Sequence, residues 1–319
     1  MRKLALATVK FAVSAALLYF ALRRVELGRM TERLNQIELG WIAAAIAINI
    51  LQVVLVTVRW RRILDICGIA LRMRPALRFN MVATFFSQVL PSTVGGDAAR
   101  IWLLARTGAG WATATYTVLL DRFVGVLVLA AMVTAGLHWS LALVQDPVGR
   151  LVLVAIGAGS LAGGAAFLAL GSISLLNRWS VTRPFLTMSM FARQMLWSRR
   201  SAPVILVSSV LVHLMTALAA WMVARAVQVP LDYLQALLLI LPVMLIATVP
   251  ISIAGWGVRE TALVLAFGYA GLHSSDGLVV SVLFGGVQFA VGLIGGIVWL
   301  ASPGDRAVVS AQPQAPSVG

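Results

Sequence analysis

The chain has 319 residues, of which 61% are hydrophobic and 11% are charged. About a quarter of the residues of an ordinary soluble domain are charged, so this composition excludes that class and indicates an integral membrane protein. The formal charge of +14 does not indicate nucleic-acid binding, because the basic residues cluster in short connections between long apolar runs. Cys67 is the only cysteine, which excludes an internal disulfide and a thiolate metal site.

The first predicted span is the apolar run 4–22, which ends without a small-x-small cleavage site and is therefore expected to be retained. The mixed-charge segment 23–38 is expected to form a short amphipathic surface helix. Residues 41–58 carry no charge and are long enough for a second span. A basic loop is predicted next, with six arginines: Arg59, Arg61, Arg62, Arg72, Arg74 and Arg78.

Residues 79–106 form the segment around which the chain is organised. An apolar helix is predicted to end at Pro91 and to be followed by an irregular stretch that begins at Ser92. A second apolar helix is predicted next, with Asp97 and Arg100 in its first turn. A broken helix with charges at the break is costly in lipid. The segment therefore predicts a functional site.

The rest of the chain alternates apolar runs with short polar connections. A long span is predicted at 111–137 and contains the charged pair Asp121 and Arg122. Further spans are predicted at 151–176, 202–224 and 278–300. A second basic loop carries Arg178, Arg183, Arg193, Arg199 and Arg200. The tail, residues 301–319, is rich in Pro, Ser, Gln and Ala and is expected to be disordered.

The pattern of Pro, Gly and Arg residues at the break of the first segment occurs again in residues 234–271. Both segments fit the pattern P-x4-G-x3-R, half a chain length apart. The corresponding residues are Pro91 and Pro250, Gly96 and Gly255, and Arg100 and Arg259. This agreement predicts two structural repeats.

The distribution of Arg and Lys places both termini in the cytoplasm, with the two basic loops on the same side of the membrane. The arginines of 23–33 then fall outside. The predicted fold is an all-α, polytopic integral membrane protein with about six full spans and two re-entrant broken-helix hairpins. Three full spans separate the hairpins, so repeat 1 (41–137) and repeat 2 (202–300) are predicted to be inverted within one transmembrane domain, 1–300. A kinked span is the alternative interpretation of each broken segment.

The predicted helix starts near Asp97 and Val258 present free N–H groups to an anion. Arg100 and Arg259 add full charges there, Arg122 offers a third cation, and a guanidinium group suits phosphate oxygens. The candidate substrate-binding residues are Ser92, Gly96, Asp97, Arg100, Arg122, Gly255, Gly257, Arg259 and Glu260, with Pro91 and Pro250 as the helix breaks.

Each charged candidate also has a structural interpretation. Asp97 and Arg100 have the i, i+3 spacing of a helical ion pair, and Arg259 and Glu260 could pair with other helices without binding a ligand. Asp97 and Glu260 could instead carry a proton in proton-driven transport. The motifs of common membrane enzymes are absent, so we expect no enzyme, no cofactor and no metal site.

Three stretches carry a family resemblance: LPSTVGGDAARIWLLAR at 90–106, LLDRFVG at 119–125, and VPISIAGWGVRE at 249–260 with the ALVLAFG that follows. They resemble the membrane region of lysylphosphatidylglycerol synthases and their stand-alone relatives, the flippase-like domain proteins, over residues 4–300. The resemblance implies movement of a lipid between leaflets. The bifunctional members make an aminoacylated lipid in a soluble C-terminal domain, whereas only a short tail follows residue 300 here, so that activity is not expected.

The leading functional hypothesis is therefore a lipid flippase or lipid transporter of the bacterial inner membrane that works by alternating access. A phospholipid, a polyprenyl phosphate and a hopanoid-type lipid all stay open as substrates, lipid-synthesis enzymes are candidate partners, and no nucleic-acid partner is expected. The alternatives are a membrane-embedded transferase acting on polyprenyl-phosphate sugars or lipid-linked glycans, and a non-catalytic subunit of a lipid-synthesis complex. The sequence does not determine the oligomeric state.

Overall fold

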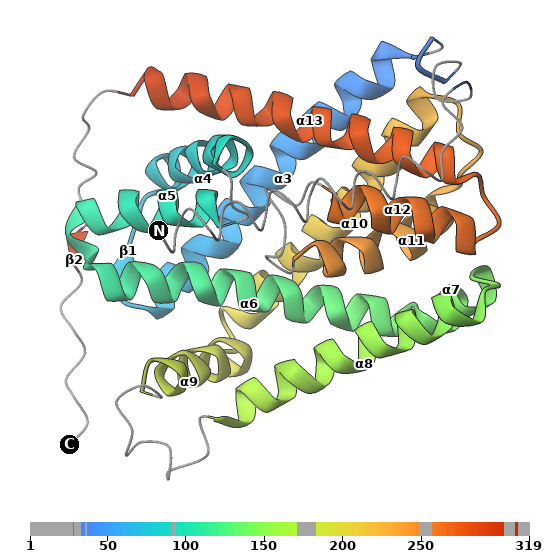
Figure 1. The fold of residues 1–319 in the computed structure, drawn as a ribbon. Helices are drawn as coiled ribbons and strands as arrows, with labels where there is room; N and C mark the ends of the chain where they lie inside the picture. Colours follow the sequence, from blue (N-terminus) through green and yellow to red (C-terminus); the bar gives the residue numbers. More distant parts are fainter. Residues whose placement is uncertain are drawn as a thin grey trace, which may run out of the picture.

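The structure is a computed structural model that describes residues 28, 33–35, 37–90, 94–170, 183–248, 257–302 and 310–311. The described part of the chain is all-α, with eleven α-helices, one five-residue π-helical turn and two short strands. Figure 1 shows long helices that cross the molecule at inclined angles to one another, with short helices between them.

Within the described residues, five helices are long and apolar enough to cross a membrane, so the protein is polytopic. At 1.5 Å per residue, 20 residues cover the roughly 30 Å of a bilayer core. The five are α3 (Leu39–Ile66), α6 (Trp111–Ala135), α8 (Pro147–Leu170), α10 (Ala202–Ala226) and α13 (Ser274–Leu300). They confirm the spans predicted from residue 41 onward, whereas the predicted span 4–22 lies outside the described residues.

Four short helices occupy the positions of the two broken segments. They are α4 (Met73–Val89) and α5 (Gly95–Leu104) in the first segment, and α11 (Tyr233–Ala247) and α12 (Val258–Tyr269) in the second. The four short helices lie between α13 and α6, since α4 and α12 pack on α13 while α5 and α11 pack on α6 (Figure 1). Asp97, Arg100, Arg259 and Glu260 are thereby buried inside the helix bundle, whereas Arg106 at the end of the first segment is exposed.

Two loops predicted from the arginine clusters are wrong in their extent. Helix α3 continues to Ile66, so Arg59 lies inside it, and α4 begins at Met73, so Arg74 and Arg78 are helical. The second basic segment contains the amphipathic helix α9 (Arg183–Trp197). A hydropathy count ends a span at the first charge, but a helix tolerates an arginine that finds a partner or reaches the interface.

The remaining elements close the ends of the bundle. The π-helical turn η1 (Ala105–Ala109) joins α5 to α6, and α7 (Leu137–Leu143) joins α6 to α8. Strand β1 (Ile69–Ala70) pairs antiparallel with β2 (Ser310–Ala311), within the predicted tail. The other residues of that tail beyond Ser302 lie outside the described part.

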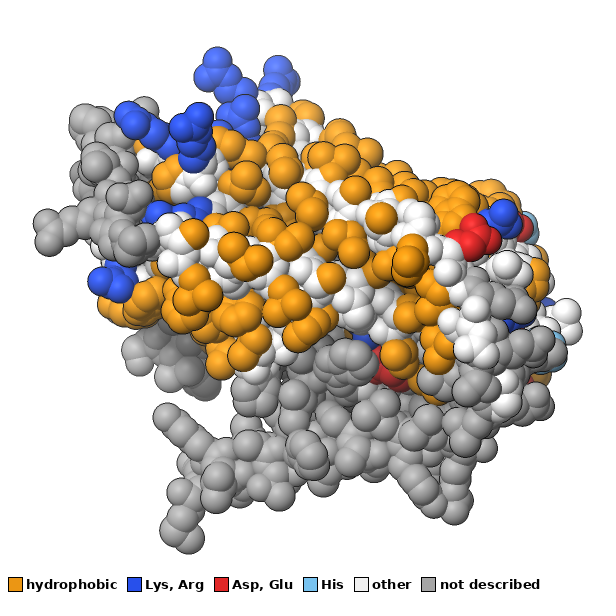
Figure 2. Space-filling model, turned by 90° about the horizontal axis from the view of Figure 1, so that it is seen from above, with side chains coloured by type: hydrophobic (Ala, Val, Ile, Leu, Met, Phe, Trp, Pro, Cys, Tyr) orange, Lys and Arg blue, Asp and Glu red, His pale blue; other side chains and the backbone are white. Residues whose placement is uncertain are grey.

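The surface has a hydrophobic body with charges toward its ends. Figure 2 shows orange side chains over the middle of the visible face, blue Lys and Arg side chains gathered at the left end, and red side chains together with some blue ones at the right end. The exposed residues Arg62, Arg72 and Arg74 lie beside β1, whereas Glu38 and Asp232 precede α3 and α11 at the other end. An apolar belt between two charged ends is the surface that a bilayer requires.

Helix α13 approaches α4 closely because glycine faces it. A Cβ atom on Gly295 would clash with the carbonyl oxygen of Met81 and would lie 2.9 Å from Thr84 Oγ1. Gly286 of the same helix has open space around it.

We expect Gly295→Ala to destabilise the protein by about 1–3 kcal/mol, the usual effect of overpacking. Gly286→Ala is the matched control, and it should leave stability unchanged or raise it slightly because alanine favours a helix. Thermal unfolding of the purified variants in detergent measures the difference. Equal unfolding temperatures for the two variants would contradict the close α13–α4 contact.

Candidate functional site

The first two short helices run antiparallel, and glycines let them meet. A Cβ atom on Gly95 would lie 2.7 Å from Leu90 Cβ, and one on Gly96 would clash with Ser87 Oγ and the carbonyl oxygen of Ala83. Because glycine has no Cβ atom, the start of α5 can lie directly against the end of α4, where no larger residue would fit. Asp97 is therefore buried on the first turn of α5, and Arg100 is buried on the next turn.

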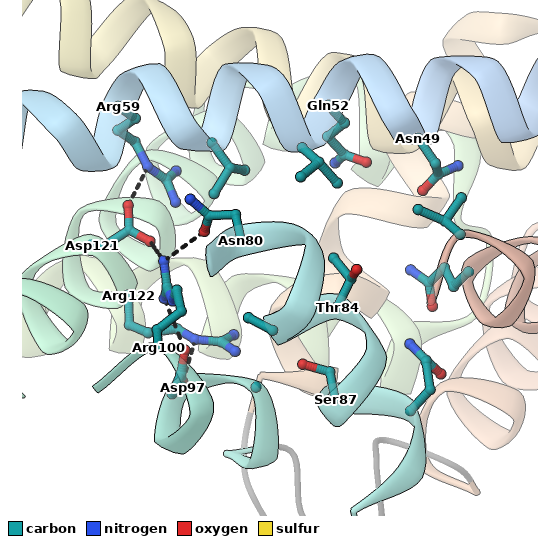
Figure 3. A pocket seen from close by; sticks show the side chains of 17 residues that line it. Asn49, Gln52, Arg59, Asn80, Thr84, Ser87, Asp97, Arg100, Asp121 and Arg122 are labelled. Carbon is teal, nitrogen blue, oxygen red and sulfur yellow. Dashed lines mark hydrogen bonds and ion pairs between the residues drawn. The ribbon is translucent and has the colours of Figure 1, made fainter. Parts of the chain in front are cut away.

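Charged side chains from three helices form a continuous chain of ion pairs. Arg59 Nε of α3 donates to Asp121 Oδ1 of α6 at 2.7 Å, and Arg100 Nη1 of α5 donates to Asp121 Oδ2 at 2.8 Å. Arg100 Nη2 donates to Asp97 Oδ1 at 2.8 Å, and Arg122 Nε donates to Asp97 Oδ2 at 2.7 Å (Figure 3). Both oxygens of each aspartate therefore bind arginine.

Neighbouring polar and aromatic groups fix the central arginine. Arg100 Nη1 also donates to Asn80 Oδ1 at 3.3 Å, and its guanidinium carbon lies 5.3 Å from the centroid of the Trp60 ring. Asn80 is oriented in turn because its amide donates to Thr57 Oγ1 and to the Ala76 carbonyl oxygen. A planar cation held on several sides keeps one orientation.

These charges line a polar cavity of about 300 Å³ inside the bundle. Helices α3, α4, α5, α6 and α13 all contribute to its wall. The polar lining residues are Asn49, Gln52, Arg59, Asn80, Thr84, Ser87, Gln88, Asp97, Arg100, Asp121, Arg122 and Gln288. Such a concentration of polar groups within membrane-spanning helices is costly, which makes this cavity the candidate functional site.

The charges of the cavity do not cancel. Three arginines face two aspartates in the lining, which leaves a net charge of +1. Arg122 has most of the hydrogen-bond donors that remain available among the arginines of the cavity. Its side chain is 51% exposed, and only its Nε is hydrogen-bonded to a described residue. Its two terminal amino groups are a fork of donors that suits an anionic oxygen pair.

The second arginine constellation lies next to this cavity. Arg259 Nε and Nη2 donate to Glu260 Oε1 at 3.1 and 2.7 Å, and Arg259 Nε also donates to Ser281 Oγ at 3.1 Å. Arg259 Nη1 donates to Gln288 Oε1 at 3.0 Å. Because Gln288 lines the cavity and Arg259 does not, Gln288 connects the second broken segment to the first.

Glu260 also closes the start of α12. Its Oε2 accepts from the Gly257 N–H at 2.6 Å, and its side chain is fully buried. Gly257 has a φ of 87°, a conformation that favours glycine. The roles of Gly257 and Glu260 in the described structure are thus to form the helix start and to bind Arg259.

The sequence-predicted site residues divide into three groups. Gly96, Asp97, Arg100 and Arg122 line the cavity, while Gly257, Arg259 and Glu260 form the adjacent network. Ser92, Gly255, Pro91 and Pro250 lie outside the described residues. Helix α4 ends at Val89 and α11 at Ala247, shortly before these prolines.

Sequence reasoning missed Arg59 and the amides of the cavity wall. Arg59 was assigned to a loop, although it is only 6% exposed and pairs with Asp121. A signal existed, because an aspartate inside an apolar span needs a cation on a neighbouring helix. Nothing in the sequence pattern distinguishes Gln52 or Gln288 from other polar residues of a span. Among the described residues, no group of three or more His, Cys, Asp or Glu side chains could hold a metal ion.

Comparison with families of known proteins identifies a match over most of the chain. The family model described as "Lysylphosphatidylglycerol synthase TM region" matches residues 7–296. The match includes the whole cavity and the adjacent arginine network. No curated protein matches the chain.

Proposed function

The chain belongs to the lysylphosphatidylglycerol synthase TM region family, and from this premise we propose that it is a flippase that moves an anionic, phosphate-bearing lipid between the leaflets of a bacterial inner membrane. The family description names a phospholipid synthase, which supports a role connected with phospholipids. The observation that carries the proposal is the polar cavity with its net positive charge. A phosphate group would bind there through Arg122, with Arg100 and Arg59 supporting the local positive charge.

An inverted repeat of two re-entrant hairpins is the proposed framework of this transport. Helices α3, α4, α5 and α6 have 28, 17, 10 and 25 residues, and α10, α11, α12 and α13 have 25, 15, 12 and 27. Packing supports the same correspondence, since α3 packs on α10, α4 on α13 and α11 on α6. In such a framework, one repeat rocks against the other and exposes the headgroup alternately to each side.

The charge distribution supports an orientation for this framework. The exposed arginines Arg62, Arg72 and Arg74 lie at the end of the bundle that carries β1. We therefore propose that this end, where α13 also finishes (Figure 1), faces the cytoplasm.

Leaflet exchange in reconstituted vesicles tests the proposal. Purified protein is placed in liposomes that contain acyl-labelled fluorescent phosphatidylglycerol, and a membrane-impermeant quencher reports the fraction that remains protected. We expect loss of protection on a timescale of minutes with the protein and a stable protected fraction in protein-free vesicles. Exchange no faster than in protein-free vesicles would remove the proposal. Formation of a new lipid product by the protein in detergent, where no two leaflets exist, would instead favour a membrane-embedded transferase.

A further inference from the structure

A second cavity, between α8 and the helices α11 and α12, is apolar and measures about 310 Å³. The described residues that line it include no charged side chain, and Thr261 and Tyr269 carry its only hydroxyl groups. It shares no lining residue with the polar cavity. We propose that this apolar cavity binds one hydrocarbon chain of a bilayer lipid, and that this lipid is not the one held by the polar cavity.

Helix α12 forms one side of the apolar cavity. Six of its residues line the space, at the spacing of three and four that places side chains on one helix face: Val258, Thr261, Ala262, Leu265, Ala266 and Tyr269. Arg259 does not line this cavity and binds Gln288, a residue of the polar cavity, instead. Helix α12 therefore has an apolar face toward one cavity and a charged connection to the other.

A glycine of α8 closes one end of the apolar cavity. A Cβ atom on Gly149 would lie 2.9 Å from Tyr269 Cδ2, and the Gln145 N–H donates to the Tyr269 carbonyl oxygen at 3.0 Å. Further along α8, a Cβ atom on Gly157 would lie 3.1 Å from Thr134 Oγ1 of α6. Helix α8 thus touches α12 at its start and then packs on α6, which leaves the space beside α11 and α12 open.

The bilayer has access to this space from the side of α8. Val152 lines the cavity and is 40% exposed, and its neighbours Leu151 and Val154 are exposed as well. Of the five candidate spans in the described residues, α8 is the least buried. Hydrocarbon chains of the bilayer surround such a face. A chain that enters the cavity gains van der Waals contacts that an empty cavity lacks, and the lining offers no charged partner for a headgroup.

Position and size indicate which part of which lipid fits. The α8 residues of the lining lie between Gly149 and Ile156, and the first ten residues of the helix, 147–156, cover about 15 Å from the end that carries α7. That end lies opposite β1 (Figure 1), so the chain belongs to the leaflet away from the cytoplasm in the proposed orientation. The volume equals that of about ten water molecules, which is enough for part of one chain and too little for a whole lipid.

Photolabelling of the full-length protein in lipid vesicles tests the site. The vesicles contain phosphatidylcholine with a photoactivatable diazirine in one acyl chain, and mass spectrometry locates the adducts after irradiation. We expect adducts on the lining residues of α8, α11 and α12, with a yield that saturates as the fraction of labelled lipid rises. Adducts on the outward face of α8 should instead increase in proportion to that fraction, because lipids there exchange freely.

Two variants close the cavity from different sides. Ala262→Phe fills it from α12, and Val152→Trp blocks its opening from a position that is already exposed. Each should reduce adducts on the other lining residues about tenfold, because overpacking opposes entry of the chain. Ala162→Phe, on the exposed face of α8 outside the cavity, is the matched control and should keep the wild-type yield. Val152→Trp decides the test if Ala262→Phe does not fold.

A further comparison identifies the source of the chain. The same diazirine chain is presented on phosphatidylglycerol, and both labelled lipids are also tested with Arg122→Ala. A bilayer lipid should label the apolar cavity equally from either headgroup and independently of Arg122. Labelling from phosphatidylglycerol alone, or its loss in Arg122→Ala, would overturn the proposal and assign the cavity to the tail of the transported lipid.

Two other results would also contradict the site. Unlabelled lining residues beside a labelled outward face of α8 would show that no lipid chain enters, as when the cavity is filled by a segment of the chain such as the apolar run 4–22. The wild-type yield in both Ala262→Phe and Val152→Trp would show that the adducts come from lipid outside the cavity. Loss of leaflet exchange has no bearing on this site, because the expected labelling requires no transport.

Discussion

Replacing Arg122 by alanine is expected to slow leaflet exchange of phosphatidylglycerol by about 10- to 100-fold, the effect of losing one or two charge-assisted hydrogen bonds. Arg122 is the arginine of the cavity whose terminal amino groups bind no described residue. Folding should change little, because half of the side chain is exposed and Asp97 keeps its bond to Arg100. The exchange rate in vesicles and the unfolding temperature in detergent are measured on the same preparation.

Two further variants separate phosphate recognition from charge. Arg122→Lys keeps the charge but not the planar fork of donors, so we expect an exchange rate between those of the wild type and the alanine variant. Arg74→Ala removes an exposed arginine of α4 outside the cavity and should exchange lipid at the wild-type rate. An alanine variant at position 122 that is as fast as Arg74→Ala would exclude Arg122 from the transport site.

Replacing Asp121 by alanine is expected to destabilise the protein by about 3–5 kcal/mol, the cost of leaving a buried ion without its partner. Asp121 binds Arg59 and Arg100 at once, and the side chains of these arginines are only 7% and 5% exposed. Removing this carboxylate therefore leaves Arg59 buried without a carboxylate partner and Arg100 with Asp97 alone. Unfolding of the purified protein in detergent, followed by temperature or denaturant, gives the difference.

Asp65→Ala is the matched control for this loss. Asp65 pairs with Arg62 at 3.7 Å on the surface, where the two side chains are 48% and 45% exposed. Exposed pairs contribute about 0–1 kcal/mol, so this variant should unfold close to the wild type. Adding Arg59→Met to Asp121→Ala should recover part of the lost stability, because it removes the buried cation that has lost its carboxylate partner. Equal stability of Asp121→Ala and Asp65→Ala would show that the buried charge chain does not hold the bundle together.

Both experiments depend on an arrangement that the sequence predicts only in part. The apolar runs and the two segments with Pro, Gly and Arg identify where helices lie and where short helices replace long ones, because a bilayer imposes a fixed length on an apolar helix. The same local signals identify Asp97, Arg100 and Arg122 as candidates. The bounds of helix α3 could not be predicted in this way, since its last two turns carry arginines that hydropathy assigns to a loop.

The sequence by itself determines the membrane class, the order of long and short helices, and the presence of charges at the first break, because each depends on residues that are neighbours in the chain. Only the tertiary structure decides which charges pair and which group remains free to bind a ligand. Arg59 and Asp121 are 62 residues apart, and Arg122 keeps free amino groups because Asp97 lies beside its Nε. Gln288 joins the second arginine network to the cavity for the same reason: helix packing brings together side chains that no local pattern connects.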